Sequence, residues 1–321
     1  KDKEVGPLNL DMSLNEESNM QIDSLSFELE GGVHNSISGV FKHNMEGYKF
    51  EGNVTSKGDD IKSVVELISD SKFVRQEGGE RSAYELSAEL ILSDSVLDLR
   101  NINAIIGLGE VKGEVHYNIL EQSKSKIFLD AKALDFNEFL VSKGENDVRH
   151  LIHLLYDKLA VRESGISLLQ NFLWLRNIFN EINFELNLKE AIFNDRVLDV
   201  VKIDGLVKHR IFNIKDFYIK SEYNDINTSF LISLNDSEPF LNINIDANKA
   251  DLALFNYSDG YQNKNSSWSK ELILFPNFEN MDFNLTSKFK HLKYHELAVK
   301  DTIFNLSVKN NILKLEEVSG K

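Results

Sequence analysis

The stretch ILSDSVLDLRNI, residues 91–102, organises this chain, because its pattern of apolar positions recurs twice downstream. The second copy is LVKHRIFNIKDF at residues 206–217, and the third is SVKNNILKLEEV at residues 307–318. Each copy reads as an alternating strand, a two-residue turn and a second alternating strand, which is the sequence form of a β-hairpin. The sequence therefore predicts three equivalent hairpins that align without a gap.

The turn positions predict which side chains face one another across each hairpin. The turns are expected at residues 94–95, 209–210 and 310–311, and Asn310-Asn311 suits the positive φ that such turns demand. Every resulting cross-strand pair is apolar on the same side of its hairpin. The predicted pairs are Leu92–Leu97, Leu90–Leu99, Val207–Phe212, Val308–Leu313 and Leu306–Leu315. One face of a repeated sheet is therefore expected to be apolar.

The overall composition limits the classes of protein that fit. A chain of 321 residues implies two domains or one elongated repeating sheet, and a hydrophobic content of 42% is enough for an ordered core. The net charge of -15 opposes binding to nucleic acid and to anionic membrane surfaces. The absence of cysteine excludes disulfides, thiolate metal sites and cysteine nucleophiles. No nucleic-acid partner is expected.

The ends of the chain suggest a piece of a longer protein. The sequence starts at Lys1 and stops at Lys321 within what reads as a repeat. No stretch of about 18 to 20 consecutive apolar residues is present, so no segment of this sequence is expected to span a bilayer. An anchor or signal sequence, if one exists, would lie outside it.

A second level of repetition relates residues 97–140 to residues 212–255. With one inserted residue, Asp130-Ala131 aligns with Asp246-Ala247. Both units read as strand, strand and long alternating strand, which indicates a module of about five strands. The expected modules are a weaker N-terminal β repeat at 1–83, β repeats at 84–146 and 183–257, a loop boundary at 258–280, and a truncated C-terminal β repeat at 281–321.

One segment departs from the β pattern. Between residues 147 and 182, Val148, Leu151 and Leu155 recur at helical spacing, and Leu168 and Phe172 begin a second series. The predicted fold is mainly β: an elongated, curved antiparallel sheet of repeated hairpin modules that forms a groove, with an α-helical insert at about 147–182.

The sequence contains no clear metal-binding or catalytic motif. The pairs His150/His153 and His291/His295 have metal-like spacing, but neither lies in a two-histidine-plus-glutamate zinc motif, and surface or packing roles are expected. There is no P-loop and no serine elbow. We therefore expect no metal, no cofactor and no enzymatic activity.

The glycines at residues 107–113 partly match a nucleotide-binding loop. Gly107, Gly109 and Gly113 approach the dinucleotide-binding pattern, but the third glycine is misplaced by one position and a strand follows instead of a helix. These glycines are expected to serve a turn.

The apolar face itself admits two interpretations. It could pack against a second sheet or the helices as an ordinary core, as most alternating sheets do. Alternatively, the sheet curls into an open trough whose apolar inner face holds acyl chains. The residues expected to line such a groove are Leu90, Leu92, Leu97, Leu99, Val207, Phe212, Ile214, Leu306, Val308, Leu313 and Leu315.

The hairpin followed by a glycine-bearing strand and a closing strand resembles the repeating unit of the AsmA-like proteins of Gram-negative envelopes. The residues that carry the likeness are ILKLEEVSG at 312–320 and DAKALDF at 130–136. An insert after the closing strand and a restart at residues 182–186, INFEL, are similar to the family layout. The resemblance covers residues 84–321 best.

The resemblance implies a periplasmic protein, anchored in the inner membrane, whose β-taco domain forms a hydrophobic groove toward the outer membrane. Its implied activity is passive phospholipid transport between the membranes without catalysis, with phospholipid acyl chains and envelope proteins as partners. The alternative is a non-enzymatic structural or protein-interaction β-sandwich or solenoid of the envelope, acting in outer-membrane assembly. It would present acidic, asparagine-rich faces to partner proteins.

Overall fold

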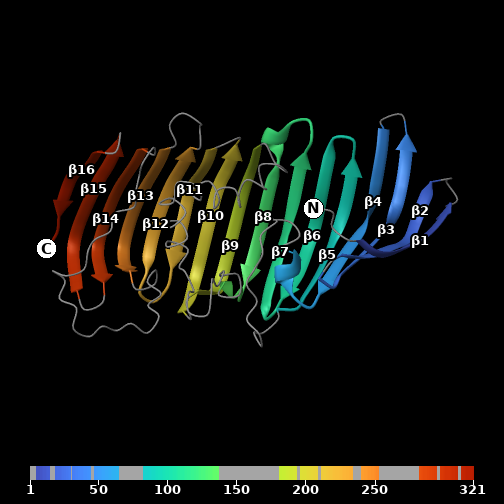
Figure 1. Ribbon diagram of the computed structural model, residues 1–321, viewed down its shortest axis with the longest axis horizontal. Helices are drawn as coiled ribbons and strands as arrows, with labels where there is room; N and C mark the ends of the chain where they lie inside the picture. The colour runs from blue at the N-terminus through green and yellow to red at the C-terminus, as the bar shows by residue number, and fades with distance from the viewer. Residues whose placement is uncertain are drawn as a thin grey trace.

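The strands of this chain form one long, curved, open sheet (Figure 1). A computed structural model describes residues 5–14, 19–29, 31–44, 47–64, 82–136, 181–193, 196–208, 211–233, 240–252, 282–294, 297–309 and 312–321. All sixteen strands belong to the same sheet, and their order in the sheet is their order in the chain. The described strands therefore form one layer, unlike the two packed sheets of the alternative β-sandwich.

The strands are between seven and thirteen residues long. Their bounds are β1 Val5–Leu14, β2 Met20–Leu29, β3 Val33–Asn44, β4 Gly47–Gly58, β5 Tyr84–Ser93, β6 Val96–Ile106, β7 Gly109–Asn118, β8 Lys126–Lys132, β9 Glu181–Phe193, β10 Arg196–Lys208, β11 Ile211–Lys220, β12 Asp225–Ser233, β13 Phe240–Asp251, β14 Asp282–Tyr294, β15 Leu297–Lys309 and β16 Ile312–Ser319. In the described ranges, helix is limited to a turn at 61–64, the 3-10 helix η1, Gln122–Lys124, and single 3-10 residues at Phe136 and Leu252.

Two parallel pairs divide an otherwise antiparallel sheet. β8 pairs with β9 and β13 pairs with β14 in parallel, and every other neighbouring pair is antiparallel. Five strands, β9 to β13, lie between the two parallel junctions. The two parallel junctions are therefore five strands apart.

The mainly β, curved and repeated fold is confirmed, and the helical insert is not. Most of the predicted insert at 147–182 lies outside the described residues, as does the predicted loop boundary at 258–280. The last two residues of the predicted insert, Glu181 and Ile182, begin strand β9. The prediction was wrong at this end, because Ile182, Phe184 and Leu186 continue a period of two that overrides the helical reading.

The predicted hairpin register is confirmed at every pair. Leu92 pairs with Leu97 and Leu90 with Leu99 between β5 and β6. The same register joins Val207 to Phe212 in the second hairpin. In the third hairpin, the pairs are Val308–Leu313 and Leu306–Leu315. The strand residues on either side of each predicted turn therefore pair in all three hairpins as the aligned copies predict.

The apolar face contains a row of side chains that crosses the whole sheet, which we call the central row. Each member pairs with the next across neighbouring strands, and every member is apolar or glycine. The central row is Met12, Ile22, Gly39, Gly52, Leu90, Leu99, Val115, Ile127, Phe184, Gly205, Ile214, Phe230, Ile243, Leu285, Leu306 and Leu315. The described core clusters lie on this face; the largest surrounds Leu188 and Val201.

A β-bulge recurs at the same place in the repeats. The register shifts between Leu99 and Ile102 in β6 and between Ile214 and Phe217 in β11. In β16, Leu315 pairs with Leu306 but Glu317 pairs with Asn305, so one residue of β16 is again extra. Each bulge returns the next apolar side chain to the apolar face. Because a bulge bends its strand and increases the local twist, the repeated bulges favour the curvature of the sheet.

Candidate functional site

The residues predicted to line a groove lie in two adjacent rows of the apolar face. Leu90, Leu99, Ile214, Leu306 and Leu315 belong to the central row. The others belong to the next row toward the hairpin turns, which we call the turn-side row. Its predicted members are Leu92, Leu97, Val207, Phe212, Val308 and Leu313. The sheet therefore brings together side chains from three repeats that are far apart in sequence.

These side chains differ in exposure according to their position along the sheet. Val207 and Val308 are 2% and 3% exposed, whereas Leu315 on the edge strand β16 is 57% exposed. Leu92, beside the β5–β6 turn, is 42% exposed. The predicted residues thus form an apolar surface that is closed at some positions and open to solvent at others.

Three glycines of the central row are covered by large side chains. A Cβ on Gly39 or Gly52 would lie 2.8 Å from the ring carbon Cζ of Phe50. A Cβ on Gly205 would lie 2.6 Å from Cζ of Phe184. Aromatic rings over glycines keep the row apolar where it lacks side chains and allow close contact with the backbone. The sequence analysis missed this arrangement.

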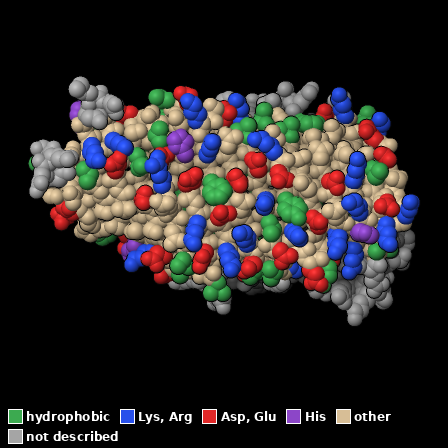
Figure 2. Space-filling model, turned by 180° about the vertical axis from the view of Figure 1, so that it is seen from behind, with side chains coloured by type: hydrophobic (Ala, Val, Ile, Leu, Met, Phe, Trp, Pro, Cys, Tyr) green, Lys and Arg blue, Asp and Glu red, His purple; other side chains and the backbone are tan. Residues whose placement is uncertain are grey.

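The opposite face of the sheet, which we call the outer face, is polar. Figure 2 shows basic and acidic side chains spread over the molecule, with isolated hydrophobic groups between them. Glu51 of β4 forms ion pairs with Lys42 of β3, at 2.8 Å, and with Lys49. Hydrogen bonds from these two lysines lower the pKa of Glu51 to about 2. The two faces of the sheet therefore differ sharply in polarity.

Asp98 is the centre of a small polar cluster on the outer face. Its side chain is buried between neighbouring strands and contacts Nη2 of Arg100 at 2.7 Å and Nδ1 of His116 at 2.5 Å. A buried carboxylate requires such partners, because an unpaired one would carry a large desolvation cost. The contacts of Arg100 and His116 with the Asp98 carboxylate therefore have a structural explanation.

Burial raises the pKa of two tyrosines, and their hydrogen bonds differ. The Tyr84 hydroxyl lies 3.0 Å from Oγ of Ser56, and burial raises the pKa of Tyr84. Burial and the nearby Asp225 carboxylate raise the pKa of Tyr218. In both tyrosines, the shift of the pKa disfavours the phenolate form.

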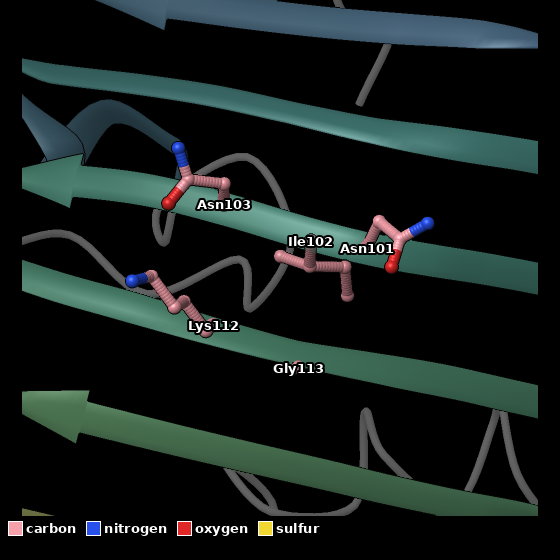
Figure 3. Close-up of a pocket in the computed structure, with 5 residues that line it drawn as sticks. All are labelled: Asn101, Ile102, Asn103, Lys112 and Gly113. Carbon is pink, nitrogen blue, oxygen red and sulfur yellow. The ribbon is translucent and has the colours of Figure 1, made fainter.

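A hollow of about 450 Å³ lies between β6 and β7 (Figure 3). It is lined by Asn101, Ile102, Asn103, Lys112 and Gly113, none of which was predicted to line a groove. Asn101 donates a hydrogen bond from Nδ2 to Oε1 of Glu89 at 2.9 Å. The polar side chains that line the hollow are two asparagines and one lysine. This set contains no carboxylate or histidine that could form an acid–base pair with the lysine.

The histidine and glycine motifs agree with structural roles where they are described. Gly107 lies in the β6–β7 turn with φ 56°, as predicted for a turn glycine. His291 is an exposed residue of β14, and its predicted partner His295 lies outside the described residues, as do His150 and His153. Among the described residues, no cluster of three or more His, Asp or Glu could hold a metal ion.

The described part of the chain contains no helix that is long and apolar enough to cross a membrane. Comparisons with protein-family models, characterised proteins and solved structures find no match.

Proposed function

We propose that the apolar face binds phospholipid acyl chains, and that this chain is the lipid-conducting segment of a periplasmic AsmA-like protein between the inner and outer membranes. The central row carries this proposal, because it crosses all sixteen strands without a polar side chain. Most of its side chains are partly exposed, although Ile214 and Leu306 are buried. A partly exposed apolar surface that crosses a whole sheet is uncommon on a monomeric protein and supports a binding role.

The hydrophobic effect supplies the binding energy in this proposal. Each acyl methylene that leaves water for the apolar face contributes about 0.8 kcal/mol. Headgroups stay in water at the open side of the curved sheet, since burying a charged phosphate without a partner is costly. No covalent step is needed.

The length of the central row suits several lipids in succession. Neighbouring strands lie about 4.8 Å apart, so sixteen strands give a row of roughly 70 Å. An acyl chain spans half of a hydrocarbon core that is about 30 Å thick. Because successive positions along the row are chemically alike, a bound lipid can pass from one to the next without a large barrier.

Native mass spectrometry of the gently purified chain tests the proposal. We expect bound phospholipid, and we expect Leu92→Glu and Phe212→Glu to reduce it strongly, because each change places a charge in the turn-side row. Asn213→Glu is the matched control, since Asn213 follows Phe212 in the same strand but lies on the outer face. Far-UV circular dichroism would establish that each variant keeps its strands.

Two outcomes would contradict the lipid proposal. One is a folded wild-type chain without phospholipid that also fails to enhance a hydrophobic fluorophore. The other is equal lipid retention by Phe212→Glu and Asn213→Glu. Either would favour the rival function, in which the outer face binds partner proteins during envelope assembly.

A further inference from the structure

A pair of polar side chains interrupts the apolar face between β3 and β4. They lie in what we call the far row, which is the apolar-face row two positions beyond the central row, toward the strand ends opposite the three hairpin turns. In this row Asn35 of β3 faces Ser56 of β4, and Leu86 of β5 follows. From Leu86 to Phe289 of β14, every further member of the far row is apolar. The polar pair is therefore a local feature of β3 and β4.

A buried tyrosine directs its hydroxyl group toward this pair. Tyr84 of β5 pairs with Gly58 of β4, and a Cβ on Gly58 would lie 2.8 Å from the ring carbon Cε1 of Tyr84. The ring therefore lies over the glycine, and its hydroxyl is 3.0 Å from Oγ of Ser56. Tyr84 is 6% exposed, whereas Asn35 and Ser56 are half-buried. We call Asn35, Ser56 and Tyr84 the polar cluster.

The polar cluster has more hydrogen-bond donors than it uses. The hydroxyls of Ser56 and Tyr84 supply two O–H donors, and the bond between them uses one. The Asn35 amide donates from Nδ2 to the carbonyl oxygen of Val33 at 3.3 Å, which leaves its second N–H. Within the described ranges, no further protein group bonds to these three side chains. One hydroxyl proton and one amide proton are thus available to an acceptor on the apolar face.

The surroundings of the polar cluster select an uncharged acceptor. Its neighbours on the apolar face are Phe27 beside Asn35, Leu86 beside Ser56, and the pair Ile37–Val54. None of these four side chains can balance a negative charge. A phosphate or carboxylate would lose its hydration there without a counter-charge, whereas a carbonyl oxygen needs only the two donors.

A lipid whose ester carbonyl lies at the polar cluster fits the length of β3 and β4. Toward the β3–β4 turn, the apolar-face positions of both strands hold only apolar residues and glycine. They are Ile37, Gly39 and Phe41 in β3, and Val54, Gly52 and Phe50 in β4. At about 3.3 Å per residue, the path from Asn35 to Phe41 is roughly 20 Å long. An acyl chain, which spans half of a hydrocarbon core about 30 Å thick, can be covered along this path.

The opposite direction suits the headgroup. β3 begins at Val33 and β4 ends at Gly58, each two residues beyond the polar cluster. A headgroup attached to the anchored ester therefore extends past the strand ends, where it keeps its hydration.

We propose that the polar cluster hydrogen-bonds the ester carbonyl of a bound diacyl lipid, with an acyl chain along β3 and β4 and the headgroup beyond the strand ends. This inference rests on the proposed function and adds to it a fixed anchoring position and a preference for ester-linked lipids. Between β5 and β14 the far row offers no such donor, so the anchor belongs to β3 and β4.

Competition between an ester lipid and an ether lipid tests the anchor. The folded chain is mixed with less than one equivalent of lipid, made of equal parts of dipalmitoyl phosphatidylcholine and its diether analogue, which lacks the carbonyls. Native mass spectrometry should show a preference for the ester lipid of about three- to tenfold, as one or two hydrogen bonds supply.

Removal of the hydroxyls should abolish this preference without abolishing binding. Tyr84→Phe keeps the ring over Gly58, and Ser56→Ala removes the second hydroxyl, so the double variant should bind the two lipids about equally. Thr55→Ala is the matched control, because Thr55 precedes Ser56 in β4 but is exposed on the outer face, and it should keep the wild-type preference.

Infrared spectroscopy of the wild-type complex gives a readout that needs no variant. With the ester carbonyls of the lipid labelled with carbon-13, a hydrogen bond from the polar cluster should lower the C=O stretching frequency of the bound lipid relative to that of an ester in an apolar solvent. Equal binding of both lipids by the wild-type chain, an unshifted band, or an unchanged preference in the double variant would each overturn the anchor while leaving acyl-chain binding intact. Failure of both lipids to bind would instead contradict the proposed function, and with it this inference.

Discussion

At the scale of single residues, the glycines of the central row decide how closely neighbouring strands and aromatic rings can pack. Gly39 and Gly52 face each other across β3 and β4 beneath the ring of Phe50. Because backbone atoms as well as the ring occupy the space that a Cβ would need, side-chain movement alone cannot make room for one. These positions should be among the most sensitive of the sheet.

Gly52→Ala should destabilise the protein by about 1–3 kcal/mol, as overpacking does in well-packed sites. Its Cβ would lie 2.1 Å from the carbonyl oxygen of Ser38 and 2.9 Å from Cα of Gly39. Urea unfolding would measure the change. Asn53→Ala is the control because Asn53 is exposed on the outer face, and equal stability of the two variants would contradict this account.

The Glu51 ion pairs should give a small pH-dependent contribution to stability. The pKa of Glu51 falls from 4.5 to about 2 on folding, so its stabilisation is present above pH 4.5 and is lost as the pH falls toward 2. Because the pairs are exposed, Glu51→Gln should cost under about 1 kcal/mol near neutral pH. An NMR titration of the Glu51 carboxyl with a midpoint near 4.5 would refute the lowered pKa.

At the scale of elements, the bulges connect the repeated sequence to the curved sheet. Asn101 provides the extra residue in β6 and adopts φ 51°, a region that Asn tolerates and β-branched residues avoid. The bulge both restores Ile102 to the apolar face and bends the strand.

Asn101→Val should destabilise the protein by about 1–3 kcal/mol, while Asn101→Gly should be close to neutral. Asn103→Val is the matched control, because Asn103 is an exposed residue of the same strand without a positive φ. Thermal unfolding followed by circular dichroism would compare the three. A similar loss for both valine variants would mean that the backbone conformation at Asn101 is not the cause.

The hairpin elements could be predicted from the sequence to the level of individual pairs, because a period of two with a two-residue turn leaves one register. The bulges were missed, although the sequence carries their signal. In each copy the third apolar residue of the second strand follows three positions after the second, as in Leu99 and Ile102. A spacing of three between residues on one face requires one extra residue in the strand.

Other features could not be predicted from local patterns. The parallel pairing of β8 with β9 joins segments that are far apart in the chain, and no short-range periodicity encodes it. The covering of Gly205 by Phe184 depends on cross-strand neighbours in β9 and β10. The residues that were predicted to line a groove lie in two rows, and most of them do so as cross-strand pairs within one hairpin.

At the scale of the whole molecule, the sheet is an amphipathic ribbon. One face has an unbroken apolar row across sixteen strands, and the other has charges and amides. The net charge of -15 keeps the outer face in water and opposes direct adsorption to an anionic bilayer. In the proposed function, a lipid bound to the apolar face would follow this row, which a single layer of backbone separates from the charged face.

Site-specific photocrosslinking to phospholipid tests this path most directly. A photoreactive residue is placed in turn at Val115, Phe230 and Leu285 of the central row, and at the neighbouring positions Glu114, Ser229 and Thr286 of the outer face. We predict crosslinks to phospholipid from the three central-row positions and none from their neighbours. Equal labelling of both faces, or no labelling of the central row in a folded protein, would contradict acyl-chain binding by this sheet.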